Sequence, residues 1–125
     1  MTRVTGIGGI FIKARDPDAL RAWYREHLEL DVQEWGGTAL VASAGDVTVW
    51  SVFPASSTYF NPSRAPFMVN YRVADLATVL AALRAEGCTV DDKTESTEYG
   101  KFGWVMDPEG NRIELWEPPA GPLPG

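Results

Sequence analysis

Glu114 is the residue of this chain whose surroundings most clearly call for a chemical explanation. It stands in the stretch DPEGNRIELWEP, between Ile113 and Leu115, where a solvated charge would not be expected. A carboxylate in such a place can be a metal ligand, a catalytic base, or a charge satisfied by a neighbouring side chain. The elements that position Glu114 decide among these three roles.

The composition is that of a folded, water-soluble domain, with 45% hydrophobic and 22% charged residues. A net charge of −6 without a basic cluster argues against a nucleic-acid partner, because Lys and Arg carry the affinity for phosphates. No apolar run approaches the ~20 residues that span a membrane, and the N-terminus lacks the pattern of a secretory signal. The lone cysteine, Cys88, excludes an internal disulfide and fits a reducing compartment. We therefore expect a cytoplasmic protein with no membrane contact.

The first half of the chain predicts one helix among several short strands. Asp16-Pro17 breaks an apolar, β-rich stretch and begins the helix, since Asp caps a helix and Pro suits its first position. Apolar residues then recur at helical spacing, at Leu20, Trp23, Tyr24 and Leu28. The expected elements are a strand over 7–14, a helix over 17–28, and strands over 32–35, 38–43 and 47–53.

The second half repeats this order, with Asp75 corresponding to Asp16 and Gly87 ending the helix. Its expected strands cover 67–73, 90–93, 101–106 and 112–117. We therefore expect an α+β fold in one domain, 1–125, in which two tandem βαβββ modules form a curved mixed sheet around a cavity. The modules cover about 5–54 and 66–118, joined by a linker over 55–65 and followed by an extended tail over 119–125.

The linker contains two aromatic residues, Tyr59 and Phe60, in the stretch PASSTYFNPSRAP. It is either a simple connection or a flap over a pocket. The aromatic residues favour the flap, since a simple linker needs none.

The paired modules, the opening IFIKARDPDALRAWY and the ending DPEGNRIELWEP resemble the vicinal oxygen chelate superfamily. That superfamily includes glyoxalase I, bleomycin-resistance proteins, fosfomycin-resistance enzymes and extradiol dioxygenases, and the similarity covers residues 7–118. In its metal-dependent members the ligands come from four equivalent strand positions, which in this chain read Gly9, Trp50, Met68 and Glu114. Only Glu114 is a good ligand for a divalent metal. The resemblance therefore implies a site with no metal and no cofactor, in a two-fold homodimer.

Alternation along the strands should bring side chains of both modules to one concave face. Its mixture of aromatic, methionine and polar side chains is typical of a small-molecule pocket. Around Glu114 the expected ligand-binding residues are Phe11, Lys13, Trp50, Met68, Asn70, Arg72, Tyr99 and Trp116. The expected core residues on the opposite face are Ile10, Ile12, Val69, Tyr71, Ile113 and Leu115. In the competing interpretation the concave face is packed shut, and Glu114 pairs with Arg72, Arg112 or Lys13.

Two classes of function remain open for such a pocket. The first is a protein that binds or sequesters a small organic molecule, planar or cationic, stacked on Trp50 and Trp116 and held by Glu114. The second is an enzyme in which Glu114 is the general base or acid of a proton transfer, a glyoxalase-like lyase or isomerase, with Tyr99 or Arg72 steadying the developing charge. We prefer binding, because the chain shows no second acid or base at a fixed spacing.

A third hypothesis is a metal-dependent glyoxalase or dioxygenase. Its ligands would come from unexpected positions such as His27 or Glu117. His27 is more simply explained as a polar residue at the end of a helix.

Overall fold

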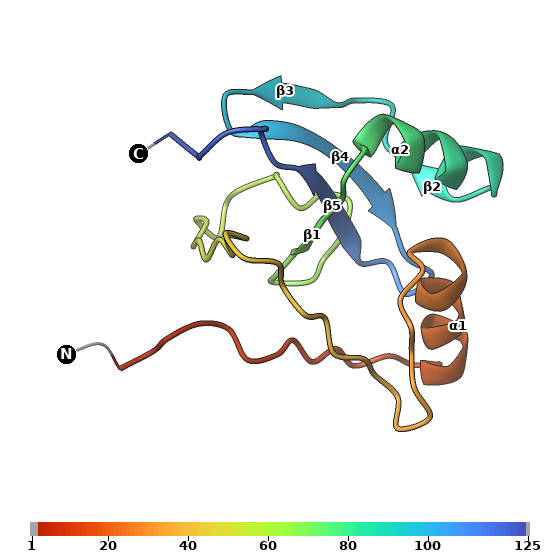
Figure 1. The fold of residues 1–125 in the computed structure, drawn as a ribbon. Helices are drawn as coiled ribbons and strands as arrows, with labels where there is room; N and C mark the ends of the chain where they lie inside the picture. Colours follow the sequence, from red (N-terminus) through yellow and green to blue (C-terminus); the bar gives the residue numbers. More distant parts are fainter. Residues whose placement is uncertain (1–2, 125) are drawn as a thin grey trace.

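Two helices pack on one face of a five-stranded sheet in the computed structural model, which describes residues 3–124 (Figure 1). The sheet order is β1-β5-β4-β2, and β3 also pairs with β4. Strand β1 runs parallel to β5, and the other pairs are antiparallel. The elements are α1 (Pro17–His27), β1 (Val69–Arg72), α2 (Leu76–Ala85), β2 (Thr89–Val90), β3 (Glu95–Thr97), β4 (Gly100–Met106) and β5 (Arg112–Glu117).

Both helices begin at the aspartates expected to cap them. The Asp16 carboxylate accepts a hydrogen bond from the Ala19 N–H at 3.1 Å, and the Asp75 carboxylate accepts one from the Thr78 N–H at 3.2 Å. These bonds satisfy backbone donors that have no partner within the helix. The helix α2 ends where Gly87 takes a φ of +83°, a conformation that glycine adopts without strain. The predicted helices are therefore confirmed to within about a residue at each end.

The core lies between the helices and the middle of the sheet. Ile113 and Leu115 of β5 are each only 1% exposed, as expected for alternate residues on the helix-facing side. Ile12 and Tyr71 pack against this core, and Val69 is half-buried. Ile10, in contrast, is 56% exposed, so its expected place in the core is wrong. The helices supply the other side of the core with Leu20, Tyr24, Leu76, Leu80 and Leu83.

The strands expected in the first half are not formed. Between residues 3 and 68 of the described chain, the helix α1 is the only regular element. The turns are present, since Gly36 N–H donates to the Gln33 carbonyl at 2.9 Å and Asp46 N–H donates to the Ser43 carbonyl at 3.1 Å. Extended backbone becomes a strand only when another strand lies at hydrogen-bonding distance. Within the described part of one chain, the segments on either side of these turns lack that neighbour.

The second half forms its sheet, with one change from expectation. The strand expected over 90–93 is replaced by two short ones, β2 and β3, which both pair with β4. The protein is therefore a mixed α+β fold with an open sheet, and the symmetry between the two halves does not extend to their strand pairing.

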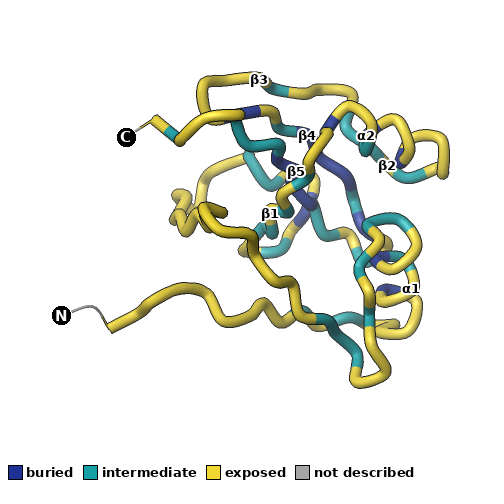
Figure 2. The backbone as a smooth tube through the Cα atoms, viewed as in Figure 1, coloured by how far each residue is buried: buried dark blue, intermediate teal, exposed yellow. Residues whose placement is uncertain are grey.

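The first half of the chain, which forms no strands in its described residues, is also the half more exposed to solvent. The buried residues gather in the helices, β4 and β5, while residues 3–60 outside α1 are mostly exposed and contain no buried residue (Figure 2). Large apolar side chains are among them, including Ile10, Phe11, Trp35, Val41, Trp50 and Val52. Within residues 3–124, neither helix combines the length and apolar character required to cross a membrane.

Candidate functional site

Glu114 lies in the middle of the sheet, on the face that points away from the helices. Its neighbours in register are Asn70 on β1 and Trp104 on β4. Because Ile113 and Leu115 face the helices, alternation turns Glu114 to the opposite face. The residue is only 7% exposed, so its charge depends on partners within the protein.

Three neutral groups hydrogen-bond to the Glu114 carboxylate. Its Oε2 accepts from the Tyr59 hydroxyl at 2.5 Å and from Trp104 Nε1–H at 3.0 Å. Its Oε1 accepts from Asn70 Nδ2–H at 2.7 Å. The partners therefore differ from the cations considered from the sequence. Glu114 is a buried carboxylate stabilised by hydrogen bonds from two aromatic side chains and one amide side chain.

The linker reaches this carboxylate through Tyr59. The Tyr59 ring packs edge-on against Trp104, with centroids 6.0 Å apart, and stacks on Phe53 at 5.4 Å. Burial, and then the hydrogen bond to Glu114, raise the pKa of the Tyr59 phenol well above its ordinary value. The phenol therefore remains a proton donor to Glu114 throughout the neutral range.

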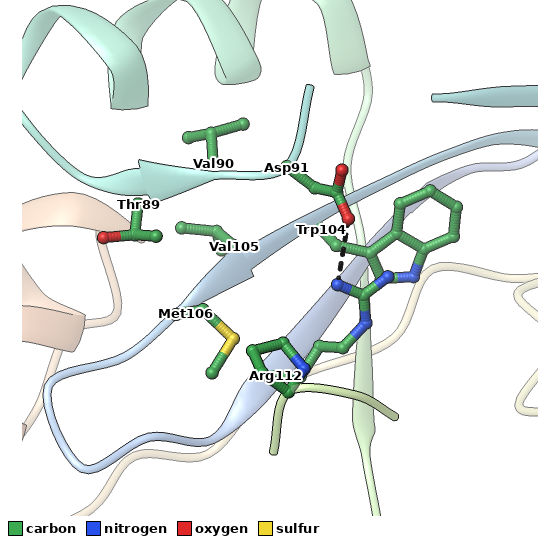
Figure 3. A pocket seen from close by; sticks show the side chains of 8 residues that line it. Thr89, Val90, Asp91, Trp104, Val105, Met106 and Arg112 are labelled. Atoms are coloured by element: carbon green, nitrogen blue, oxygen red, sulfur yellow. Dashed lines mark hydrogen bonds and ion pairs between the residues drawn. The ribbon is translucent and has the colours of Figure 1, made fainter. Parts of the chain in front are cut away.

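Arg112 lies on the same strand as Glu114 but turns to the edge of the site. Its guanidinium carbon is 4.8 Å from the centre of the Trp104 ring, and its Nη1 lies 3.2 Å from Asp91 Oδ2 (Figure 3). The backbone N–H of Lys93, and then Arg112, hold the pKa of Asp91 below its usual range. A shallow hollow beside this pair is lined by Pro62, Thr89, Asp91, Trp104, Met106 and Arg112 (Figure 3).

Two of the expected ligand-binding residues lie beside Glu114. Asn70 contacts its carboxylate directly, and Trp116, two residues along β5, is 5% exposed and stacks with Phe102 at 6.4 Å. Met68 is half-buried directly before β1. Asn70, Glu114 and Trp116 therefore lie in one region of the sheet, and Met68 lies in the chain just before it.

Arg72 and Tyr99 lie near this region but point elsewhere. Arg72 Nη1–H donates to the Val47 carbonyl at 2.6 Å, and Arg72 Nη2 is 3.8 Å from Asp46 Oδ2. The Tyr99 carbonyl accepts a hydrogen bond from Trp116 Nε1–H at 2.8 Å, while its side chain stays half-exposed.

The first-half residues expected in the pocket are on the outside of the single chain. Phe11 is 94% exposed and Trp50 is 79% exposed, and Lys13 is also exposed. One chain therefore assembles only the second-half part of the expected site.

Sequence reasoning missed two of the carboxylate's partners, Tyr59 and Trp104. The Trp104 contact follows from the hairpin turn over 107–110, because pairing Met106 with Arg112 places Trp104 opposite Glu114. The Tyr59 contact bridges 55 residues, and its only signal was the presence of aromatic residues in the linker.

The residues present do not fit a metal at the family's ligand positions. Gly9 has no ligating side chain, and Trp50 is exposed. The groups that approach Glu114 donate hydrogen atoms to it, whereas a divalent metal needs about three electron-pair donors.

A family model described as "Glyoxalase-like domain" matches residues 9–116. None of the curated proteins matches the sequence.

Solved structures share the fold at low sequence identity. TnmS3, an antibiotic binding protein from Streptomyces sp. CB03234, is 19% identical with a TM-score of 0.62, and the match covers 95% of this chain and 100% of that one. A glyoxylase/bleomycin resistance protein/dioxygenase domain from Frankia sp. EAN1pec is 21% identical with a TM-score of 0.58, covering 94% and 100%. The trypanothione-dependent glyoxalase I of Leishmania major is 22% identical with a TM-score of 0.52, covering 85% and 81%.

Proposed function

Because the chain belongs to the glyoxalase-like domain family, we propose that it is a metal-independent protein that binds or sequesters a small organic molecule at the Glu114 face. The observation that carries this proposal is the buried carboxylate held by Tyr59, Asn70 and Trp104. The charge of a fixed carboxylate orients a bound ligand, and the aromatic rings around the carboxylate add affinity through apolar contact. The fold that the chain shares with an antibiotic binding protein supports the same function.

Tyr59 indicates the chemistry of the ligand. It places a flat ring against Trp104 and an O–H donor on Glu114. A planar ligand with a hydroxyl, amine or cationic group offers the same two features, and it takes the place of Tyr59 when the linker opens. Asn70 and Trp104 keep the carboxylate in position during this exchange.

Proton transfer by Glu114 has less support. Neither of the two side chains expected to stabilise a developing charge contacts Glu114. The Arg72 guanidinium instead donates to the Val47 carbonyl and lies near the Asp46 carboxylate. Tyr99 accepts a hydrogen bond from Trp116 through its backbone carbonyl. The general-base function therefore remains the alternative, which the experiment below distinguishes from binding.

We further propose that the active form is a cytoplasmic homodimer. Phe11 and Trp50 are large apolar side chains exposed on a single chain, and a second copy that covers them removes this cost. In such a dimer these residues and Lys13 complete the wall of the ligand site. The free thiol of Cys88 fits a reducing compartment.

The test is a screen of planar amines, phenols and antibiotic-like compounds by thermal shift, followed by tryptophan fluorescence titration of each hit. Glu114→Gln keeps the shape and removes the charge, so it should weaken a ligand with a cationic or donor group by roughly 1.5–3 kcal/mol. Trp50→Ala should weaken every planar ligand, because stacking does not depend on charge. The matched control is Glu34→Gln, the same chemical change at an exposed position.

Two outcomes would contradict the proposal. Hits that bind Glu114→Gln and Trp50→Ala as tightly as the parent would make Glu114 a purely structural carboxylate. Conversion of a hit to product, abolished in Glu114→Gln with affinity retained, would establish the enzyme instead.

A further inference from the structure

The only histidine and the only cysteine of the chain lie together, far from Glu114 in sequence. His27 is the last residue of α1, and Cys88 follows the end of α2. Glu86, the C-cap residue of α2, is the third member of the group. One ligand atom from each of His27, Glu86 and Cys88 lies within 4.8 Å of the others.

The local structure holds these side chains at the meeting point of the two helices. His27 Nδ1 lies 2.7 Å from Glu86 Oε1, and the His27 side chain is only 12% exposed. The Cys88 N–H donates to the Leu83 carbonyl at 3.0 Å, which fixes the turn after α2. Glu86 is 44% exposed, so its carboxylate has room to adjust.

The electrostatics of this place favour a cation. Both helices end here, and a helix C-terminus carries partial negative charge on its unpaired carbonyls. Glu26 adds a second carboxylate, with its Oε2 3.8 Å from His27 Nε2. The two arginines in the last turns are directed elsewhere, Arg25 to the Val32 carbonyl and Arg84 to the Asp91 carbonyl.

A reactive thiol is the other role that such a group suggests. Burial, and then the Glu86 and Glu26 carboxylates, raise the pKa of the Cys88 thiol. A nucleophilic cysteine requires the opposite shift, because the thiolate is the reacting species. A nucleophilic role therefore does not account for this cluster.

We propose that His27, Glu86 and Cys88 form a binding site for a borderline-soft divalent metal, Zn²⁺ in the first place. An imidazole nitrogen, a thiolate and a carboxylate are the ligand types that zinc takes, and three protein ligands leave a fourth position for water. Cys88 is a thiol in the free protein, and the metal ion displaces its proton on binding. Zinc binds its ligands at about 2.0–2.3 Å. Donor atoms as far as 4.8 Å apart would therefore approach one another, and the hydrogen bond between His27 and Glu86 would be replaced by bonds to the ion. The bound metal ties the C-terminal end of α1 to that of α2 and is independent of ligand binding at Glu114.

The test uses the 125-residue protein. It is freed of metal, kept reduced with a phosphine, and titrated with Co²⁺ as a spectroscopic probe. One equivalent of Co²⁺ should produce a thiolate-to-cobalt charge-transfer band and the intense visible bands of a tetrahedral site, and Zn²⁺ should displace it. Cys88→Ser should abolish the charge-transfer band, and His27→Gln should weaken binding by about tenfold or more. Glu34→Gln, a substitution at an exposed position outside the cluster, is the control and should bind Co²⁺ like the parent.

A second measurement needs no variant. Zn²⁺ should slow alkylation of Cys88 in the unaltered protein, because a metal-bound thiolate is shielded from the reagent. The proposal is overturned if no Co²⁺ binds at micromolar concentrations, if the charge-transfer band persists in Cys88→Ser, or if Zn²⁺ leaves the alkylation rate unchanged. A metal lost only in Glu114→Gln would overturn both this proposal and the metal-free binding site, whereas failure of the ligand screen alone leaves the zinc site intact.

Discussion

At the scale of residues, the Glu114 network explains how a charge is kept inside a small protein. A buried carboxylate is costly unless hydrogen bonds replace its water. Here the donors come from three separate segments: Tyr59 from the linker, Asn70 from β1 and Trp104 from β4. One side chain on β5 thus connects both neighbouring strands and the segment that covers them.

Replacing Tyr59 by Phe should lower the free energy of unfolding by about 1.5 kcal/mol at neutral pH, the lower end of the range for hydrogen bonds to charged groups, because Tyr59 is partly exposed. The effect should depend on pH in a defined direction. The folded-state pKa of Tyr59 is raised, so its contribution is fully present below the ordinary phenol pKa of about 10 and is lost as the pH rises further. Urea unfolding at a series of pH values measures both quantities.

Tyr99→Phe is the control for this experiment, because the Tyr99 ring is half-exposed and its contact with Trp116 uses the backbone carbonyl. Its stability should stay within about 0.5 kcal/mol of the parent. If Tyr59→Phe and Tyr99→Phe changed the free energy of unfolding equally, Tyr59 would not form a hydrogen bond to Glu114 in solution.

At the scale of elements, the β4–β5 hairpin and its close contacts form the scaffold of the site. Gly103 lies against Leu80 of α2, where an added Cβ would come within 2.8 Å of a leucine methyl carbon. Gly100 begins β4 with a φ of +118°. An added Cβ there would collide with the Glu117 carbonyl oxygen, which belongs to the paired strand. These glycines allow β4 to approach α2 on one side and the end of β5 on the other.

Gly100→Ala should therefore destabilise the protein more than a positive φ alone explains. Gly87→Ala supplies the comparison, since Gly87 also has a positive φ but open space around its Cβ position. Left-handed backbone costs a non-glycine residue about 1–2 kcal/mol, which is the loss expected for Gly87→Ala. Urea midpoints should show a larger loss for Gly100→Ala, because the added methyl group also displaces the β4–β5 pairing. If Gly100→Ala lost no more stability than Gly87→Ala, the end of β5 would move to accommodate the added methyl group without cost.

At the scale of the whole molecule, the first half carries apolar surface that a single chain leaves in water. Phe11 and Val41 are each 94% exposed, and Trp50 is 79% exposed. Among residues 3–124, β1 has a strand partner on one side only, β5. Exposed apolar patches and open strand edges are typical of surfaces that another chain covers.

We therefore expect light scattering coupled to gel filtration to report about twice the mass of one chain at micromolar concentration. Val41→Lys should raise the dimer dissociation constant, because it places a charge in the surface that the second copy covers. Ala81→Lys, on the exposed side of α2, should leave the mass unchanged. A monomer that persists at high concentration would contradict the dimer and would require another cover for Phe11 and Trp50.

The features determined by the sequence alone are those that depend on neighbours along the chain. Asp16-Pro17 and Asp75 mark the starts of both helices, because a capping side chain bonds to backbone only a few residues away. The strand over 112–117 agrees with β5 to the residue, and the burial of Ile113 and Leu115 follows from strict alternation. The family resemblance, which the match over 9–116 confirms, rests on the same local patterns.

Only the tertiary structure decided which distant side chains meet. Tyr59 reaches Glu114 across 55 residues, and His27 reaches Glu86 across 59. Neither contact has a signature in periodicity, capping or turn chemistry, because each depends on how whole elements pack. The strands expected over 7–14 and 47–53 fail for the same reason. An extended segment becomes a strand only through a neighbour that lies elsewhere in the chain or in another copy, and alternation along the segment does not specify that neighbour.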